Sequence, residues 1–291
     1  MSITASLAGA VILLVRFIHK IPRRVIAALW CIPALRMLIP FAADSRFSLV
    51  GRLIDSCLSA KRVALADGEL DFGTVNYVGA AASYDPITYK THQLHIIFNA
   101  CTAIWATVVA LLLLFVLFSY LHAIKQASSE KVLQDNTYFS AWVSAPAVFG
   151  ICKPKILLPH FLKNKDNTYI LLHERAHIRR KDNLWRLSAI IVACVHWFNP
   201  LAWIYLRFFL NDLEQACDET VLAQIGKEKA PEYARALVDF AEQKSLLASA
   251  FGGGYLKGRV KNILSYRRVT LLSGITFFTV CAILAAVLLT N

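Results

Sequence analysis

Apolar residues are concentrated in four runs along the chain. Residues 3–18 and 25–41 form the first two runs, residues 96–121 form the third, and residues 271–290 form the fourth. The run at 96–121 is long enough to cross about 30 Å of hydrocarbon as a helix. Polar and basic residues dominate the region between the third and fourth runs. The pattern therefore predicts a membrane protein with one sizeable domain in water.

We predict a mainly α, polytopic membrane protein with four transmembrane helices. Residues 1-41 are expected to form a transmembrane helical hairpin, residues 42-95 an extracytoplasmic loop and residues 96-121 the third transmembrane helix. Residues 122-270 are expected to form a cytoplasmic domain, and residues 271-291 the fourth transmembrane helix. The composition agrees, because 17% of the residues are charged against about 25% in soluble proteins.

Basic residues orient the predicted helices. The turn at 16–24 carries four Lys or Arg and no acid, and residues 120–270 carry 21 basic against 13 acidic residues. An excess of Lys and Arg stays in the cytoplasm, so both termini and the 42-95 loop are expected outside it. The net charge is +12, but the basic residues lie at the ends of the apolar runs, so no direct contact with nucleic acid is expected.

The seven cysteines are expected to be reduced thiols, because no metal-type spacing links Cys152, Cys194 and Cys217.

A further apolar stretch, 187–210, has two interpretations. Its central residues His196, Asn199 and Pro200 would make a lipid-exposed crossing costly. Asn199-Pro200 is also typical of a helix start, with Asn as the N-cap and Pro at the first helical position. We favour two helices that meet at this point, buried in the domain or lying against the membrane. The alternative is an additional crossing, with His196 in either case interpreted as a core or interfacial residue.

A short β-hairpin is predicted within 143–159. Two apolar segments, Val148-Phe149 and Ile156-Leu157-Leu158, are separated by Lys153-Pro154. Short apolar segments on either side of a proline-containing turn are typical of a hairpin. We therefore expect a small β-hairpin inside an otherwise helical domain.

The sequence His173-Glu174-Arg175-Ala176-His177 is an HExxH motif. On a helix, residues four apart project from one face, so the two imidazoles can share one tetrahedral metal ion. Glu174 is then placed beside the position where water binds, and it can accept a proton from that water as the water attacks a carbonyl. The motif therefore predicts a zinc-dependent peptidase.

A catalytic zinc needs a third protein ligand, and acidic residues follow between 211 and 219. Glu214 and Asp218 are four residues apart and share a helical face. Glu214 is the predicted third ligand, and Asp218 is expected to accept a hydrogen bond from the distal nitrogen of a ligand imidazole. Spacing alone leaves Asp212 and Glu219 as rivals for these roles.

Several segments together resemble a known family. HERAHIRRKDN, HWFNPLAW and DLEQACDE, preceded by APAVFGICKPKILLP, are similar to the membrane metallopeptidase domain of bacterial β-lactam sensor-transducers of the BlaR/MecR type. The similarity extends to RRVIAALWCIPALRMLIPF and covers most of the chain. It implies that His173, His177 and Glu214 bind Zn²⁺ and that Glu174 is the catalytic carboxylate. Because the sequence ends at Asn291, we expect the C-terminal penicillin-binding sensor domain of those proteins to be lacking.

These inferences predict a zinc metalloendopeptidase of the gluzincin type in the bacterial cytoplasmic (inner) membrane. By resemblance it would act in signal transduction and cleave a cytoplasmic regulator such as a transcriptional repressor. The expected partners are this protein substrate, the lipid bilayer, and a separate sensor protein or a second copy of the chain. Two alternatives are a quality-control protease for membrane proteins and a non-catalytic transducer that only docks partners.

Overall fold

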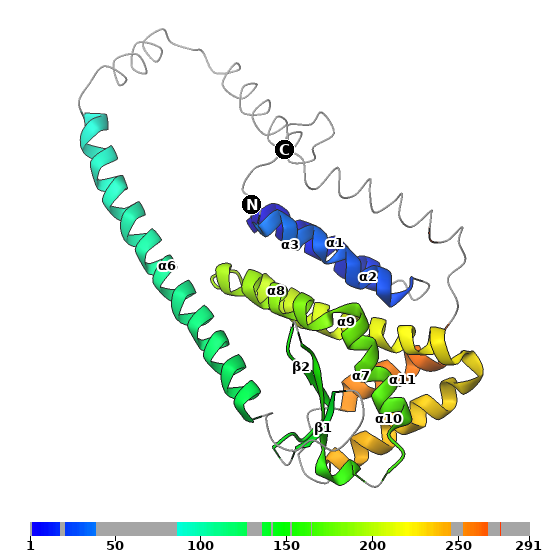
Figure 1. Cartoon of the computed structure of the whole chain (residues 1–291). Helices are drawn as coiled ribbons and strands as arrows, with labels where there is room; N and C mark the ends of the chain where they lie inside the picture. The colour runs from blue at the N-terminus through cyan, green and yellow to red at the C-terminus, as the bar shows by residue number, and fades with distance from the viewer. Residues whose placement is uncertain are drawn as a thin grey trace, which may run out of the picture. The chain divides into compact units, whose positions relative to one another are not determined.

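The computed structural model describes residues 2–17, 21–38, 86–126, 136–245 apart from 141, 152 and 164, 253–266 and residue 274. Most of the predicted 42-95 loop, and all of the predicted helix 271-291 except residue 274, lie outside these residues. The chain divides into two compact units, one of residues 1–40 and 116–282 and the other of residues 41–115 and 283–291. Figure 1 shows the arrangement of the helices and strands within the described residues. The structure is mainly helical, as predicted.

The long helix α6 (Pro86–Gln126) begins in the second unit and contains the whole predicted span 96-121. Its segment His95–Lys125 is long and apolar enough to cross a membrane. Large apolar side chains along it are exposed, including Phe115 at 68% and Phe118 at 70%. Within the described residues no other helix meets the same criteria of length and apolarity, so four spans remain a prediction.

The first two apolar runs form three helices, α1 (Ser2–Arg16), α2 (Arg23–Leu29) and α3 (Cys31–Leu38). The second run was expected to be one helix, but it is interrupted at Trp30. Pro33 explains the interruption, because proline has no N–H and its ring clashes with the carbonyl four residues earlier. Helix α1 packs against both α2 and α3.

The stretch 187–210 forms two helices, α8 (Asp182–Val195) and α9 (Pro200–Ile225). The predicted helix start is confirmed, since the Asn199 side chain accepts a hydrogen bond of 3.0 Å from the Leu201 N–H. Helices α8 and α9 pack against each other, and both pack against the N-terminal helices. Helix α1 also contacts α9 directly, because the backbone carbonyl of Ser6 accepts a hydrogen bond of 2.6 Å from the Tyr205 hydroxyl.

A buried carboxylate joins α9 to the N-terminal helices. Asp212 is fully buried, and its Oδ1 lies 2.7 Å from Nε of Arg16. The Trp30 indole N–H donates a hydrogen bond of 3.0 Å to its other oxygen. Arg23 lies 3.8 Å from Oδ1 of the same carboxylate. Three side chains from the first 30 residues thus converge on one acid of α9.

The predicted hairpin is present, within a larger sheet than expected. Strands β2 (Ala147–Phe149) and β3 (Lys155–Pro159) pair antiparallel, and β1 (Thr137–Ser140) pairs parallel to β3, giving the order β1-β3-β2. Gly150 has a φ of +94° at the turn, and a Cβ there would lie 2.6 Å from the Lys153 carbonyl oxygen. The short helix η1 (His160–Leu162) follows β3.

The described residues of the first unit also form the helices α7 (Thr168–Arg180), α10 (Ala230–Ser245) and α11 (Gly253–Leu264). The short helix η2 (Lys227–Lys229) links α9 to α10. A core of Cys217, Val221 and Leu222 from α9 packs against Tyr233 of α10 and Ile263 of α11. Helix α7 contacts α9, α10 and β2, so its inner face is surrounded by these elements.

Removal of the Asp212 carboxylate is predicted to destabilise the protein. Asp212→Ala would leave Arg16 and the Trp30 N–H without their buried partner, a loss on the order of 3 kcal/mol. Thermal unfolding of the purified protein in detergent measures this effect. Asp239→Ala, at an exposed position of α10, is the control and should change stability by less than about 0.5 kcal/mol. Equal melting temperatures for the two variants would contradict the prediction.

Candidate metal centre

Helix α7 carries the HExxH motif, and both ends of this helix have a defined local structure. Oδ1 of Asp166 accepts hydrogen bonds from the backbone and side chain of Thr168, at 3.0 and 2.6 Å. The helix ends at Lys181, whose left-handed backbone (φ 57°) lets α8 begin at the next residue. This tight reversal brings the first residue of α8, Asp182, back to the motif.

The two motif histidines face a common point. His173 and His177 are 6% and 5% exposed, and their Nε2 atoms lie 3.1 Å apart. This arrangement follows from the i, i+4 spacing on one helical face. Two imidazole nitrogens so close together require a shared proton or a shared cation.

Helix α9 adds a carboxylate at the same point. The oxygens of Glu214 lie 3.5 Å from Nε2 of His173 and 3.6 Å from Nε2 of His177. The two rival acids are engaged elsewhere, because Asp212 pairs with Arg16 and the carboxylate of Glu219 accepts N–H groups at the start of α2. Of the acids that spacing alone left as candidates for the third ligand, Glu214 faces the histidines, whereas Asp212 and Glu219 face the N-terminal helices.

The distal nitrogens of both histidines also have acidic neighbours. Nδ1 of His177 lies 2.6 Å from Oδ2 of Asp182. Nδ1 of His173 lies 2.9 Å from the Tyr233 hydroxyl and 3.3 Å from Oδ1 of Asp218. Partners of this kind hold an imidazole in one tautomer and one orientation. Sequence reasoning named Asp218 for this position but missed Asp182 and Tyr233.

Two arginines border the carboxylates. Arg259 of α11 donates two hydrogen bonds to Asp218, at 2.7 and 2.8 Å, and its Nη1 lies 3.8 Å from Glu214. Arg186 of α8 forms an ion pair with the other oxygen of Glu214. Neither arginine was predicted, because no fixed sequence spacing connects α8 or α11 to the HExxH motif.

Cys217 was also missed as a member of this cluster. It is fully buried, and its sulfur belongs with His173 and His177 to a group whose potential ligand atoms all lie within 4.8 Å of one another. The thiol contacts the His173 carbonyl oxygen at 3.4 Å. Cys217 follows Glu214 by three residues on α9, so the buried surface of this helix offers both a carboxylate and a thiol.

The acidic surroundings change the protonation of the site. Burial alone would lower the pKa of His177, but the hydrogen bond to Asp182 and other contacts outweigh it and raise the pKa to about 11. The pKa of His173 is likewise raised against the effect of burial by the groups around the ring. Burial would raise the pKa of Glu214, yet both histidines hold it well below its usual value. The pocket therefore favours positive charge at its centre.

Glu174 has a different environment from Glu214. It is 7% exposed, and burial raises the pKa of its carboxyl group above the ordinary value. A carboxylate with a raised pKa is a better proton acceptor, as a general base requires.

His196 does not belong to the site. It follows the end of α8, ten residues beyond Arg186, and its Nδ1 lies 3.2 Å from the Val192 carbonyl oxygen.

A buried HExxH helix facing an acidic helix is the arrangement found in metallopeptidases of the gluzincin type. The chain belongs to the family described as BlaR1 peptidase M56, whose model matches residues 1–272. It is 26% identical over 199 residues to the regulatory protein BlaR1 of Bacillus licheniformis, covering 58% of this chain and 33% of that protein.

Two further relatives come from Staphylococcus aureus. The chain is 32% identical over 132 residues to its regulatory protein BlaR1, covering 42% of this chain and 23% of that protein. It is 29% identical over 129 residues to the methicillin resistance mecR1 protein of strain Mu50, covering 43% and 22%. The aligned segments thus span a third or less of these relatives.

Metal binding is predicted to release protons. The Nε2 atoms of His173 and His177 lie 3.1 Å apart, and their surroundings raise both pKa values, so the pair holds one shared proton in the metal-free protein and a divalent cation must displace about one proton. The apparent affinity should therefore increase as the pH rises toward these pKa values. Titration calorimetry in buffers of different ionisation enthalpy counts the protons. A count of zero would show that both imidazoles are neutral before the metal binds.

Proposed function

We propose that the chain is a zinc-dependent metalloendopeptidase, with zinc held by His173, His177 and Glu214. The observation that supports this most directly is the convergence of two Nε2 atoms and one carboxylate within 3.6 Å of one another. Two histidines and a glutamate with an open fourth position are an established ligand set for catalytic zinc. Cys217 is the competing third ligand.

The chemistry follows from the residues around that point. When bound, zinc supplies a polarised water of lowered pKa. Glu174, buried on the same helix, would act as the general base and general acid, taking a proton from the attacking water and delivering it to the leaving amine. Asp182 and Asp218 keep the two imidazoles oriented. Arg186 pairs with Glu214 and its side chain is about one-third exposed, so in this proposal it donates a hydrogen bond to a substrate carbonyl.

The sheet offers a place for an extended substrate. Strand β2 is at an edge of the sheet and contacts α7, so it runs beside the HExxH helix. A peptide can add to such an edge through main-chain hydrogen bonds. Asn183, next to Asp182, donates to the carbonyl oxygens of Val148 and Gly150, at 2.9 and 3.1 Å. This contact fixes the position of β2 relative to the metal centre.

As the biological role we propose signalling from the bacterial cytoplasmic membrane, with a cytoplasmic regulator such as a transcriptional repressor as the substrate. Family membership and the names of the relatives, two of them regulatory proteins, support this role over quality control of membrane proteins. A separate sensor protein or a second copy of the chain would relay the signal. A transducer that only docks partners would not need the buried Glu174, which favours a catalytic role.

Substitutions at the proposed centre should separate metal binding from catalysis. Glu174→Gln is expected to retain about one zinc per chain and to lose at least about 100-fold in cleavage, because the base acts on bound water and not on the metal. Glu214→Ala is expected to lose both zinc and activity. Metal analysis of the purified protein, together with mass spectrometry of new N-termini in cells, measures the two effects.

Cys217→Ser decides between the two candidate ligands. If Glu214 is the ligand, Cys217→Ser keeps zinc and activity close to wild type. Loss of zinc from Cys217→Ser, with full zinc in Glu214→Ala, would replace Glu214 by Cys217 in the ligand set. An unchanged set of cellular N-termini in Glu174→Gln would instead favour the docking transducer.

The predicted topology of four transmembrane helices can be tested by finding on which side of the membrane individual residues lie. Reporters at residues 164 and 244 are expected to be cytoplasmic, and a reporter between residues 60 and 80 is expected outside, because positive charge favours this orientation. Single-cysteine labelling in a background without native cysteines measures accessibility from each side of the membrane. Opposite locations for residues 164 and 244 would contradict the proposed cytoplasmic domain.

A further inference from the structure

Two adjoining cavities lie beside the N-terminal helices, and only the second has charged side chains in its lining. The first has a volume of about 320 Å³ and is lined almost wholly by apolar side chains of α3, α8 and α9. The second has a volume of about 720 Å³, and its lining combines apolar side chains with Asp182, Thr220 and three arginines, Arg24, Arg179 and Arg180. Cys31, Trp185 and Phe209 line both cavities, so the two spaces meet at these residues.

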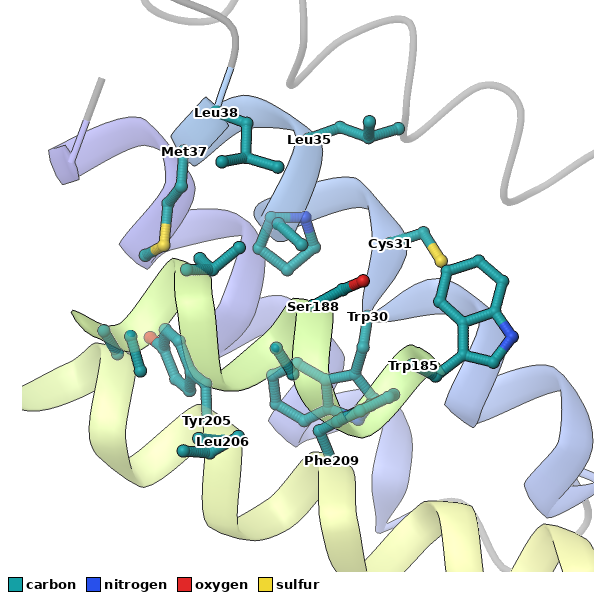
Figure 2. A pocket seen from close by; sticks show the side chains of 16 residues that line it. Trp30, Cys31, Leu35, Met37, Leu38, Trp185, Ser188, Tyr205, Leu206 and Phe209 are labelled. Carbon is teal, nitrogen blue, oxygen red and sulfur yellow. The ribbon is translucent and has the colours of Figure 1, made fainter. Parts of the chain in front are cut away.

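The apolar cavity is elongated along the helices. Its lining on α3 runs from Cys31 to Leu38 and on α8 from Trp185 to Ala193, and each stretch covers about 10–12 Å at 1.5 Å per residue. Figure 2 shows Leu35, Leu38 and Met37 at one end and Cys31 with Trp185 at the other. Leu35 and Leu38 are 46% and 51% exposed, so apolar surface continues outward from the cavity.

Basic side chains outnumber acidic ones in the lining of the second cavity, and two of its three arginines have partners within the protein. Asp182 is its one acid, and that carboxylate already contacts His177 and, at 3.3 Å, Arg180. Arg24 is exposed and donates to the Glu219 carbonyl oxygen. Arg179 is exposed and forms no ion pair within the described part of the chain. A guanidinium group binds phosphate through paired N–H donors as well as through its charge.

An apolar slot that opens onto a cluster of arginines matches one class of molecule, an amphiphile with an anionic head. We propose that this double cavity binds an anionic phospholipid, with its phosphate between Arg24, Arg179 and Arg180 and one acyl chain between α3 and the α8–α9 hairpin. Charge complementarity supports this occupant over a purely apolar peptide helix, which would offer no anionic group to Arg179 or to the net positive charge of the second cavity. The proposal is independent of the peptidase activity.

Variants can remove each half of the site without touching the metal centre. Arg179→Gln removes one phosphate donor, and Arg235→Gln, at an exposed position of α10, is the matched charge control. Ser188 lines the apolar cavity and is exposed, so Ser188→Phe should fill the slot at little cost in stability, with Ser188→Ala as its control. Arg180 is left intact because it also contacts Asp182. Thermal unfolding and zinc content establish that each variant is folded.

Native mass spectrometry of the delipidated full-length protein with phosphatidylglycerol measures binding directly. Wild type, Arg235→Gln and Ser188→Ala are expected to bind this lipid more tightly than phosphatidylcholine. Arg179→Gln should weaken binding of phosphatidylglycerol about five-fold, which corresponds to about 1 kcal/mol for one basic residue. Ser188→Phe should weaken both lipids.

The same titrations with inorganic phosphate distinguish a lipid site from a simple anion site. Competition by phosphate at concentrations equal to those of the lipid would show that the arginines bind anions without an acyl chain, and would overturn the proposal. Absence of lipid binding by the folded wild type would also overturn it, and would leave the slot to an apolar segment of protein. Equal binding in Arg179→Gln and Arg235→Gln would place the lipid elsewhere.

Discussion

The structure depends on the pairing of charges that the fold has removed from water. Around the HExxH motif, His173, His177, Asp182 and Asp218 are all buried, and each lies within about hydrogen-bond distance of a group of opposite or complementary charge. An isolated buried charge is strongly unfavourable, whereas a paired and hydrogen-bonded one is tolerated. The centre can therefore form only when α7, α8, α9 and α11 are all in place.

Helix α9 connects this centre to the rest of the first unit. At about 100° per residue, Asp212 and Glu219 project from one side of the helix, and Glu214 and Asp218 project from the other. The first pair receives Arg16, Trp30 and the backbone of α2. The second pair faces the histidines and Arg259. One helix thus holds the N-terminal helices with one acidic face and completes the metal centre with the other.

Much of the site could be predicted because its parts are local in sequence. The HExxH spacing places His173 and His177 on one face, and helical geometry alone pairs Glu214 with Asp218. The same geometry could have excluded Asp212 and Glu219, since they project from the opposite side of α9. Asp182 was missed because its approach to His177 depends on the left-handed backbone of Lys181, a conformation that lysine rarely adopts.

Other features are set by contacts between distant segments and leave no local pattern. Arg259 reaches Asp218 from a helix 41 residues away along the chain, and β1 is aligned with β3 only by sheet pairing. The division of the second apolar run at Trp30 was, by contrast, readable from Pro33. The membrane topology rests on charge distribution, because only one helix of the described residues has the length and apolarity of a span.

The two acidic faces of α9 have a consequence for the rotational register of this helix. Because Asp212 and Glu219 are fixed by partners on α1 and α2, the azimuth of Glu214 about the helix axis is fixed as well. Insertion of one residue between Asp212 and Glu214 would rotate every later side chain by about 100°. The carboxylate would then point away from the histidines while the N-terminal contact of Asp212 was kept. The segment from 212 to 219 is therefore constrained in its length as well as in the identity of its four acidic residues.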